Sequence, residues 1–123
     1  MVPPGIGGNR MTALELTTSD RDGGARIALN GELDIATAPR LEEEVRRLET
    51  EGRKLIVIDL RGLEFMDSSG LRALLAADTR ARERGARLVI IRGDDRIQRV
   101  LRITRLDERL EIVDDDGAQA GAA

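Results

Sequence analysis

The chain has 123 residues, of which 41% are hydrophobic, and this suits one ordinary domain with a single core. Charged residues make up 35% of the chain but nearly cancel, to a net charge of -3, and Phe65 is the only aromatic residue, so we expect no nucleic-acid partner. The absence of cysteine and histidine excludes disulfides, thiolate zinc sites and a Ser-His-Asp triad.

The first elements along the chain form a predicted β-hairpin. Leu14 and Leu16 alternate with polar residues, and so do Ile27 and Leu29, as in strands with one buried face. Residues 20–24, with the sequence Asp-Arg-Asp-Gly-Gly, join the two segments as a turn. We therefore expect an antiparallel pair at one edge of a sheet.

The hydrophobic period becomes helical after Thr37. We expect the Thr37 side chain to cap this helix and Pro39 to lie in its first turn, where a missing N–H breaks no hydrogen bond. Gly52 is expected to end the helix. Apolar residues at spacings of four and three mark its buried face: Leu41, Val45 and Leu48.

Two continuous apolar runs, residues 55–58 and 88–91, predict central strands that are covered on both faces. Residues 62–65 are expected to form a short link after the first of these strands. A helix then runs from Ser69 to a stop at Gly85. A strand, helix and strand in this order predict a parallel crossover.

The last elements are a third helix, capped by Asp94 or Asp95, and a short edge strand at residues 110–113. The predicted fold class is therefore α/β: a single domain, residues 13–113, with a mixed sheet of four to five strands and helices packed on it. We expect residues 1–12 and 114–123 to be mobile tails, because they offer little to bury.

The sequence Met66-Asp67-Ser68-Ser69-Gly70-Leu71 lies where a predicted strand meets a predicted helix. Asp and Ser are common helix caps, so a purely structural role is one interpretation. A single side chain satisfies a cap, which leaves a hydroxyl unexplained beside Gly70, a residue small enough to let another molecule approach. A nucleophilic serine needs a base, whereas a phosphoacceptor needs only a reachable hydroxyl because a kinase supplies the rest.

The two flanking motifs resemble those of a known family. Residues 65–71 after an Ile/Val/Leu strand, together with Gly31-Glu32-Leu33-Asp34 before the helix at Thr37, are similar to the anti-sigma factor antagonists with a STAS domain. The resemblance runs from about Leu14 to Val113. It implies a bacterial transcription regulator with a sheet and helices packed on it, and no enzymatic activity.

The resemblance also implies a partner-switching cycle. The unphosphorylated antagonist binds an anti-sigma factor that is also a serine kinase, and the sigma factor is released. The kinase then phosphorylates the serine that precedes the glycine, which is Ser69 here, with Ser68 as second choice, and a serine phosphatase reverses the reaction. The expected partner-binding residues are Asp34, Asp67, Ser68, Gly70, Arg72 and Ala73, of which Arg72 and Ala73 are expected to be exposed.

A phosphate adds about -1.5 to -2 charges, which a helix N-terminus tolerates but a docked partner must desolvate. The modification is therefore predicted to switch binding and leave folding intact. The alternative is a constitutive STAS scaffold, or a regulatory subunit of a larger stress-signalling or membrane-transport complex, in which the serine only caps. An enzyme or nucleotide-binding protein is less favoured, because no phosphate loop or catalytic base is visible.

No apolar run exceeds residues 73–77, far below the ~20 residues of a membrane span, and residues 1–12 lack the apolar segment of a signal peptide. We therefore expect no membrane span and a cytoplasmic location. The acidic residues 114–116 lack the alternating oxygen ligands of a calcium loop, so the sequence predicts neither a metal site nor a cofactor.

Overall fold

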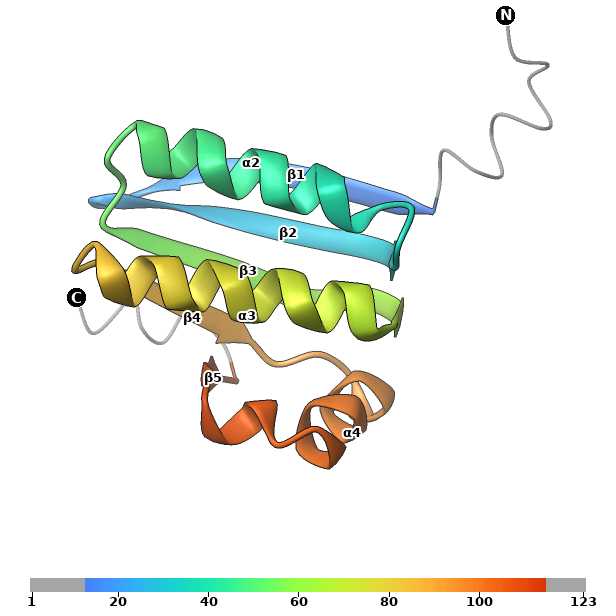
Figure 1. Cartoon of the computed structure of the whole chain (residues 1–123). Coiled ribbons are helices and arrows are strands. Elements are labelled where there is room, and N and C mark those ends of the chain that lie inside the picture. Colours follow the sequence, from blue (N-terminus) through green and yellow to red (C-terminus); the bar gives the residue numbers. More distant parts are fainter. Residues whose placement is uncertain (1–12, 115–123) are drawn as a thin grey trace, which may run out of the picture.

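The structure is a computed structural model that describes residues 13–114 (Figure 1). The predicted tails, 1–12 and 114–123, lie outside this range, apart from Asp114. The described elements are β1 (Leu14–Arg21), β2 (Gly24–Leu33), α2 (Ala38–Thr50), β3 (Leu55–Met66), α3 (Ser68–Glu83), β4 (Arg87–Ile91), α4 (Asp95–Ile103), the short 3-10 helix η1 (Leu106–Glu108) and β5 (Glu111–Val113).

The strands form one mixed sheet in the order β1-β2-β3-β4-β5. β1 and β2 are an antiparallel hairpin at one edge, and its tight turn includes Gly23, whose φ of 73° is one that glycine adopts without strain. All other neighbouring strands are parallel, because a helix connects each pair. The predicted fold class, the hairpin and the element order are confirmed.

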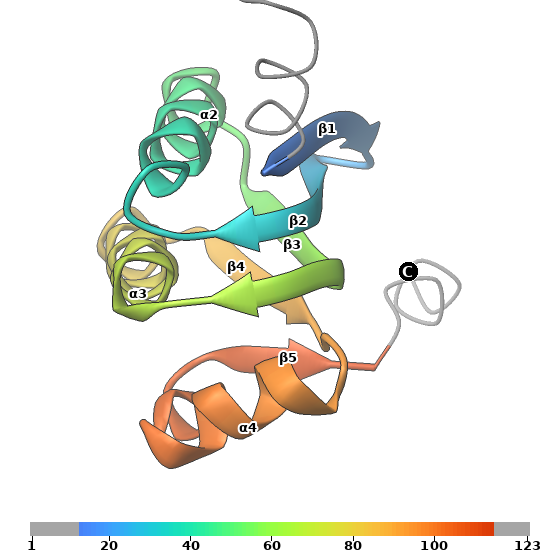
Figure 2. The same cartoon turned by 90° about the vertical axis from the view of Figure 1, so that its right-hand side faces the viewer.

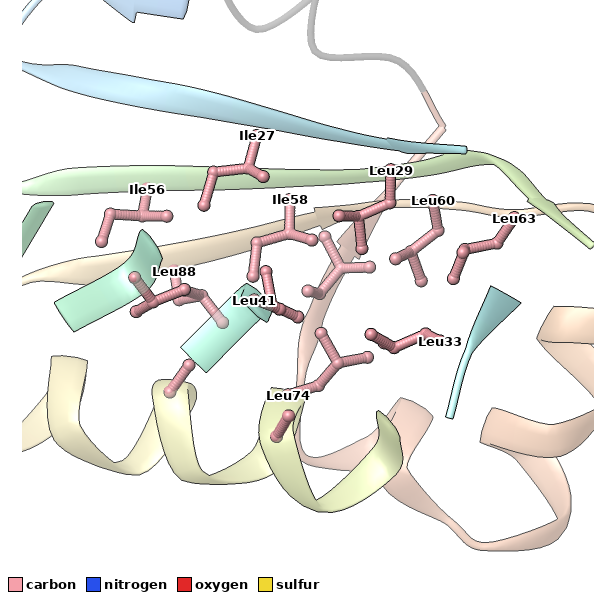
Figure 3. Packing of buried hydrophobic residues seen from close by; sticks show 14 of the residues in the cluster. Ile27, Leu29, Leu33, Leu41, Ile56, Ile58, Leu60, Leu63, Leu74 and Leu88 are labelled. Carbon is pink, nitrogen blue, oxygen red and sulfur yellow. The ribbon is translucent and has the colours of Figure 1, made fainter. Parts of the chain in front are cut away.

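One face of the sheet carries the main core. Figure 2 shows α2 and α3 side by side over this face, with α4 next to the β5 edge. Figure 3 shows Leu41 of α2 and Leu74 of α3 facing strand residues such as Ile56 and Ile58. The apolar spacing of each helix thus turns its predicted stripe toward the sheet, which stabilises the arrangement by removing apolar surface from water.

β3 is longer than the sequence predicted. Residues 62–65 were expected to link a strand to a helix, but β3 continues through them to Met66. Pairing with β2 explains the extension, since Phe65 pairs with Glu32 and Met66 with Leu33. Irregularities in the register of β2 and β3 between Ala28 and Glu32 accommodate this extra length.

The sheet face opposite α2 and α3 carries a buried carboxylate. Asp59 accepts hydrogen bonds from Arg61, including one of 2.8 Å, and one of 2.5 Å from Arg26. Burial opposes ionisation of Asp59, but the hydrogen bonds from Arg61 and Arg26 outweigh it and lower its pKa to about 2. The same face holds a small apolar cluster of Val57, Val89 and Ile91.

Within residues 13–114, no helix has the length and apolar character needed to cross a bilayer.

The low pKa of Asp59 predicts acid sensitivity. The unfolded chain takes up a proton at a pH near 3.8 and the folded chain only near 2, so this ion pair stabilises the fold above pH 4 and is lost as the pH falls toward 2. The difference corresponds to about 2 kcal/mol of unfolding free energy. Urea denaturation should show Asp59→Asn to be less stable than the wild type at pH 5, with the two converging near pH 2. A constant difference across that range would contradict this account.

Candidate functional site

The candidate site lies where β2 and β3 end. Because these strands are parallel and Leu33 pairs with Met66, the residues that follow them, Asp34 and Asp67, emerge at the same edge of the sheet. The loop from Asp34 to Thr37 leads into α2, and Asp67 leads directly into α3 (Figure 1). Two motifs that are distant in sequence therefore meet here. We call the surface formed by Asp34, Ile35, Asp67, Ser68, Ser69 and Arg72 the α3 corner.

Asp67 holds the α3 corner together. Its Oδ1 accepts the N–H groups of Ser69 at 2.8 Å and Gly70 at 3.2 Å, which would otherwise have no partner in the first turn of α3. Its Oδ2 accepts the N–H of Ile35 at 3.3 Å. Its own N–H donates to the Leu33 carbonyl at 3.2 Å. One side chain thus caps α3 and fastens the loop after β2.

Asp34 plays a similar local role before α2. Its Oδ1 accepts the N–H groups of Ala36 at 3.0 Å and Thr37 at 3.1 Å. Thr37 was expected to cap α2, but its side chain makes no capping hydrogen bond and is buried. The Thr37 hydroxyl donates to the Glu32 carbonyl at 2.8 Å and accepts the Asp34 N–H at 2.9 Å, so it closes the loop instead. Pro39 lies in the first turn, as predicted.

Neither serine hydroxyl caps α3, because the Asp67 side chain makes that cap. Ser68 is exposed and Ser69 is half-buried. The Ser69 Oγ accepts a long hydrogen bond of 3.3 Å from the Nη2 of Arg72, one turn further along the helix. Arg72 itself is exposed, as expected. The sequence motif therefore places two accessible hydroxyls beside a carboxylate and a guanidinium.

Two residues that were expected at the contact surface are buried instead. Ala73 was expected to be exposed, which is wrong: it is 2% exposed and belongs to the core, because it lies on the side of α3 that faces the sheet. Gly70 is also buried, and a Cβ there would lie 2.8 Å from the Met66 side chain and 2.9 Å from both Leu33 Cγ and the Leu33 carbonyl oxygen. Its small size therefore serves packing within the chain.

Ile35 was missed by the sequence analysis. Its side chain is 75% exposed although it is large and apolar, and it sits between Asp34 and Ala36 in the loop held by Asp67. Phe65, the aromatic residue just before the site, is 49% exposed. The sequence did offer one signal for Ile35: it is an apolar residue in a polar loop, directly after the Gly31-Glu32-Leu33-Asp34 motif. Such an exposed apolar side chain is available for contact with another molecule.

The described cavities lie elsewhere. One of about 440 Å³ is lined by residues of α4, η1 and β5 and by Arg92, which follows β4, and one of about 200 Å³ by residues of α3, β4 and β5. No residue of the α3 corner lines either cavity. Across residues 13–114, no cluster of three or more acidic, histidine or cysteine side chains is arranged to bind a metal ion. The α3 corner is therefore a surface that lies outside both of these cavities.

Comparison with known proteins agrees with this geometry. A family model described as the STAS domain matches residues 14–117, and the chain belongs to this family. The chain is similar to a Listeria monocytogenes protein named anti-sigma-B factor antagonist, with 33% identity over 95 residues that cover 77% of this chain and 83% of the relative. The predicted resemblance to STAS-domain anti-sigma factor antagonists is confirmed.

Two solved structures share the fold. The crystal structure of an anti-sigma factor antagonist from Mycobacterium paratuberculosis has a TM-score of 0.76 and 27% identity, covering 90% of this chain and 94% of the other. The cell fate determinant SpoIIAA of Bacillus, in its phosphorylated form, has a TM-score of 0.68 and 20% identity, covering 90% of this chain and all of the other. The second likeness is one of fold alone.

The tight packing at Gly70 predicts that Gly70→Ala is destabilising. Alanine normally favours a helix over glycine, but here the added methyl group overlaps Leu33 and Met66 at under 3 Å, and overpacking of this kind costs about 1 to 3 kcal/mol. Thermal unfolding should show a lower Tm for this variant. The matched control is Ser68→Ala, an exposed change in the same turn, which should leave Tm nearly unchanged. An equal or higher Tm for Gly70→Ala would contradict the packing argument.

Proposed function

We propose that the chain is an anti-sigma factor antagonist that binds an anti-sigma factor serine kinase when unphosphorylated and loses that binding when Ser69 is phosphorylated. The observation that carries the proposal is the capping of α3 by Asp67. Because Asp67 satisfies the helix start, neither serine hydroxyl is needed there for folding. The relatives named anti-sigma-B factor antagonist support the general function.

The proposed modification is a phosphoryl transfer. The kinase supplies ATP, its metal ion and a base; the Ser69 Oγ attacks the γ-phosphorus, its proton passes to the base, and ADP leaves. The antagonist supplies only the hydroxyl. Hydrolysis of the phosphoserine by a partner phosphatase returns the hydroxyl and releases inorganic phosphate.

Ser69 is preferred over Ser68 as the acceptor because it matches the serine that precedes the glycine in the family motif. Its half-buried side chain lies between Asp67 and Arg72 on the first turn of α3. The kinase must therefore contact the α3 corner itself to reach this hydroxyl. Ser68 is the more exposed of the two and stays the second choice.

The charge of the phosphate explains why binding and folding would respond differently. In the free protein the phosphate remains in water, and a helix N-terminus favours an anion by about 0.3 to 1 kcal/mol. In a complex the same charge must be desolvated against the partner, at a cost of several kcal/mol if nothing pairs with it. A loss of about 2.7 kcal/mol already lowers the affinity a hundredfold. The modification is thus expected to act on the complex far more than on the fold.

We further propose that Ile35 is an apolar contact for the kinase beside the serines. Asp67 holds the backbone of Ile35 against the start of α3, while the side chain projects into solvent. Burial of one such side chain at the centre of an interface contributes about 1.5 to 3 kcal/mol. The proposed contact surface therefore combines Asp34, Ile35, Asp67, Ser68 and Arg72 and omits the buried Ala73 and the buried Gly70.

The acceptor assignment predicts one phosphorylated position. When the protein is mixed with the cognate kinase and ATP, mass spectrometry should find one added phosphate on the peptide containing residues 68–69, with fragmentation placing it on Ser69. Ser69→Ala should abolish the modification, and the matched control Ser68→Ala should retain it. Phosphate that persists in Ser69→Ala and disappears in Ser68→Ala would transfer the assignment to Ser68.

The interface predicts variants that weaken binding and leave stability unchanged. Ile35→Ala should lower kinase affinity by about 10-fold, and Ser69→Asp should lower it by at least about 10-fold, as measured by titration calorimetry without ATP. Ile35 is exposed, and Ser69 is half-buried but makes no cap, so Tm should stay within a few degrees of the wild-type value.

Ile103→Ala is the matched control, because Ile103 is 72% exposed at the end of α4, outside the α3 corner. It should bind like the wild type. Equal losses for Ile35→Ala and Ile103→Ala would argue against the α3 corner as the docking site. A stable complex that is insensitive to ATP and to all Ser69 variants would instead favour the constitutive scaffold.

A further inference from the structure

We infer that Arg72 is the counter-ion that this chain itself provides for a phosphate on Ser69. The inference rests on the proposed function, in which Ser69 is the phosphoacceptor, and adds a residue that acts on the modified state. It starts from the one polar contact that Arg72 makes within residues 13–114, the 3.3 Å hydrogen bond from its Nη2 to the Ser69 Oγ.

The arginines of α3 differ in their partners. Arg80 donates to the Glu49 carboxylate at 3.0 Å, and Arg82 donates to the Asp78 carboxylate at 2.8 Å. Arg72, by contrast, has a neutral hydroxyl as its partner, at a distance that is long for a hydrogen bond. Its guanidinium is exposed and has no ion pair among the described residues, so it is available to an anion that arrives at Ser69.

The helix geometry directs Arg72 toward that position. Residues three apart lie on the same side of a helix, and side chains lean toward the helix N-terminus, so the Arg72 side chain extends back over Ser69. The observed contact has this orientation. Because phosphate oxygens extend beyond the Oγ to which the phosphorus is bonded, they fall within reach of the same guanidinium. A hydrogen bond from a charged donor to a neutral acceptor would become one in which donor and acceptor are both charged, which is shorter and stronger.

Arg72 also balances the negative charge on the other side of the phosphate. Asp67 lies on the N-terminal side of Ser69, and Asp34 lies in the adjoining loop. Without a nearby cation, a phosphate at Ser69 would be repelled by these carboxylates. Arg72 lies on the C-terminal side, so it draws the phosphate along α3 and away from Asp67. The first turn can then keep its cap after modification.

The test uses full-length protein in which phosphoserine is incorporated at position 69 during translation, so no kinase is needed. A ³¹P NMR titration follows the second ionisation of the phosphate, which lies near pH 6 in a free phosphoserine. A cation close to the phosphate favours the dianion, so Arg72→Gln should move the titration midpoint to higher pH, by about 0.3. Arg72→Lys keeps the charge and should move it less.

Arg46→Gln is the matched control, because it removes one exposed arginine from α2 and changes the net charge equally. Its titration midpoint should equal that of the protein that carries phosphoserine at position 69 and no other change. The inference is overturned if Arg72→Gln has the same midpoint as the wild type, or if Arg46→Gln moves it as far. A kinase that does not modify Ser69 would overturn the proposed function and leave this titration result intact, so the two failures are distinguishable.

Discussion

The carboxylate of Asp67 is the interaction on which the candidate site depends. One oxygen satisfies the first N–H groups of α3 and the other holds the loop that follows β2. A carboxylate is suited to this because its two oxygens can accept several hydrogen bonds at once, whereas a hydroxyl would satisfy fewer of the donors. The parallel pairing of β2 and β3 delivers both segments to the same edge, so a single residue can join them.

This arrangement separates the groups that fold the chain from those that are exposed at the α3 corner. Below the surface, Gly70 packs directly on Leu33 and Met66, and Thr37 closes the loop beside them. At the surface, the two serine hydroxyls do not cap α3, and the Ile35 side chain is exposed on a loop whose backbone is held by Asp67. A surface presented on a rigid base costs little conformational entropy when it binds, which favours specific recognition.

The sequence was sufficient for the architecture and insufficient for the fine structure of the candidate site. Hydrophobic periods of two and of three to four identified the hairpin and the helices, and the continuous apolar runs identified the central strands. The extension of β3 to Met66 depends on pairing with β2, a long-range contact that local pattern does not encode. The burial of Ala73 depends on how α3 is rotated over the sheet, and the exposure of Ile35 depends on the closure of its loop.

The two ends of α3 are held by different interactions, and this difference determines how far a charge added at its start would disturb the helix. Near the C-terminal end, the buried Asp78 accepts hydrogen bonds from Arg82 at 2.8 Å and from Arg109 at 3.0 Å, which fastens the helix to the segment before β5. At its start the helix is held by the Asp67 cap and by the packing of Gly70. Salt bridges that anchor the far end lie several turns from Ser69 and beyond a Debye length of about 8 Å, so an added charge would be screened from them. A phosphate at the start of α3 would therefore change the surface that a partner meets while the helix stays in place.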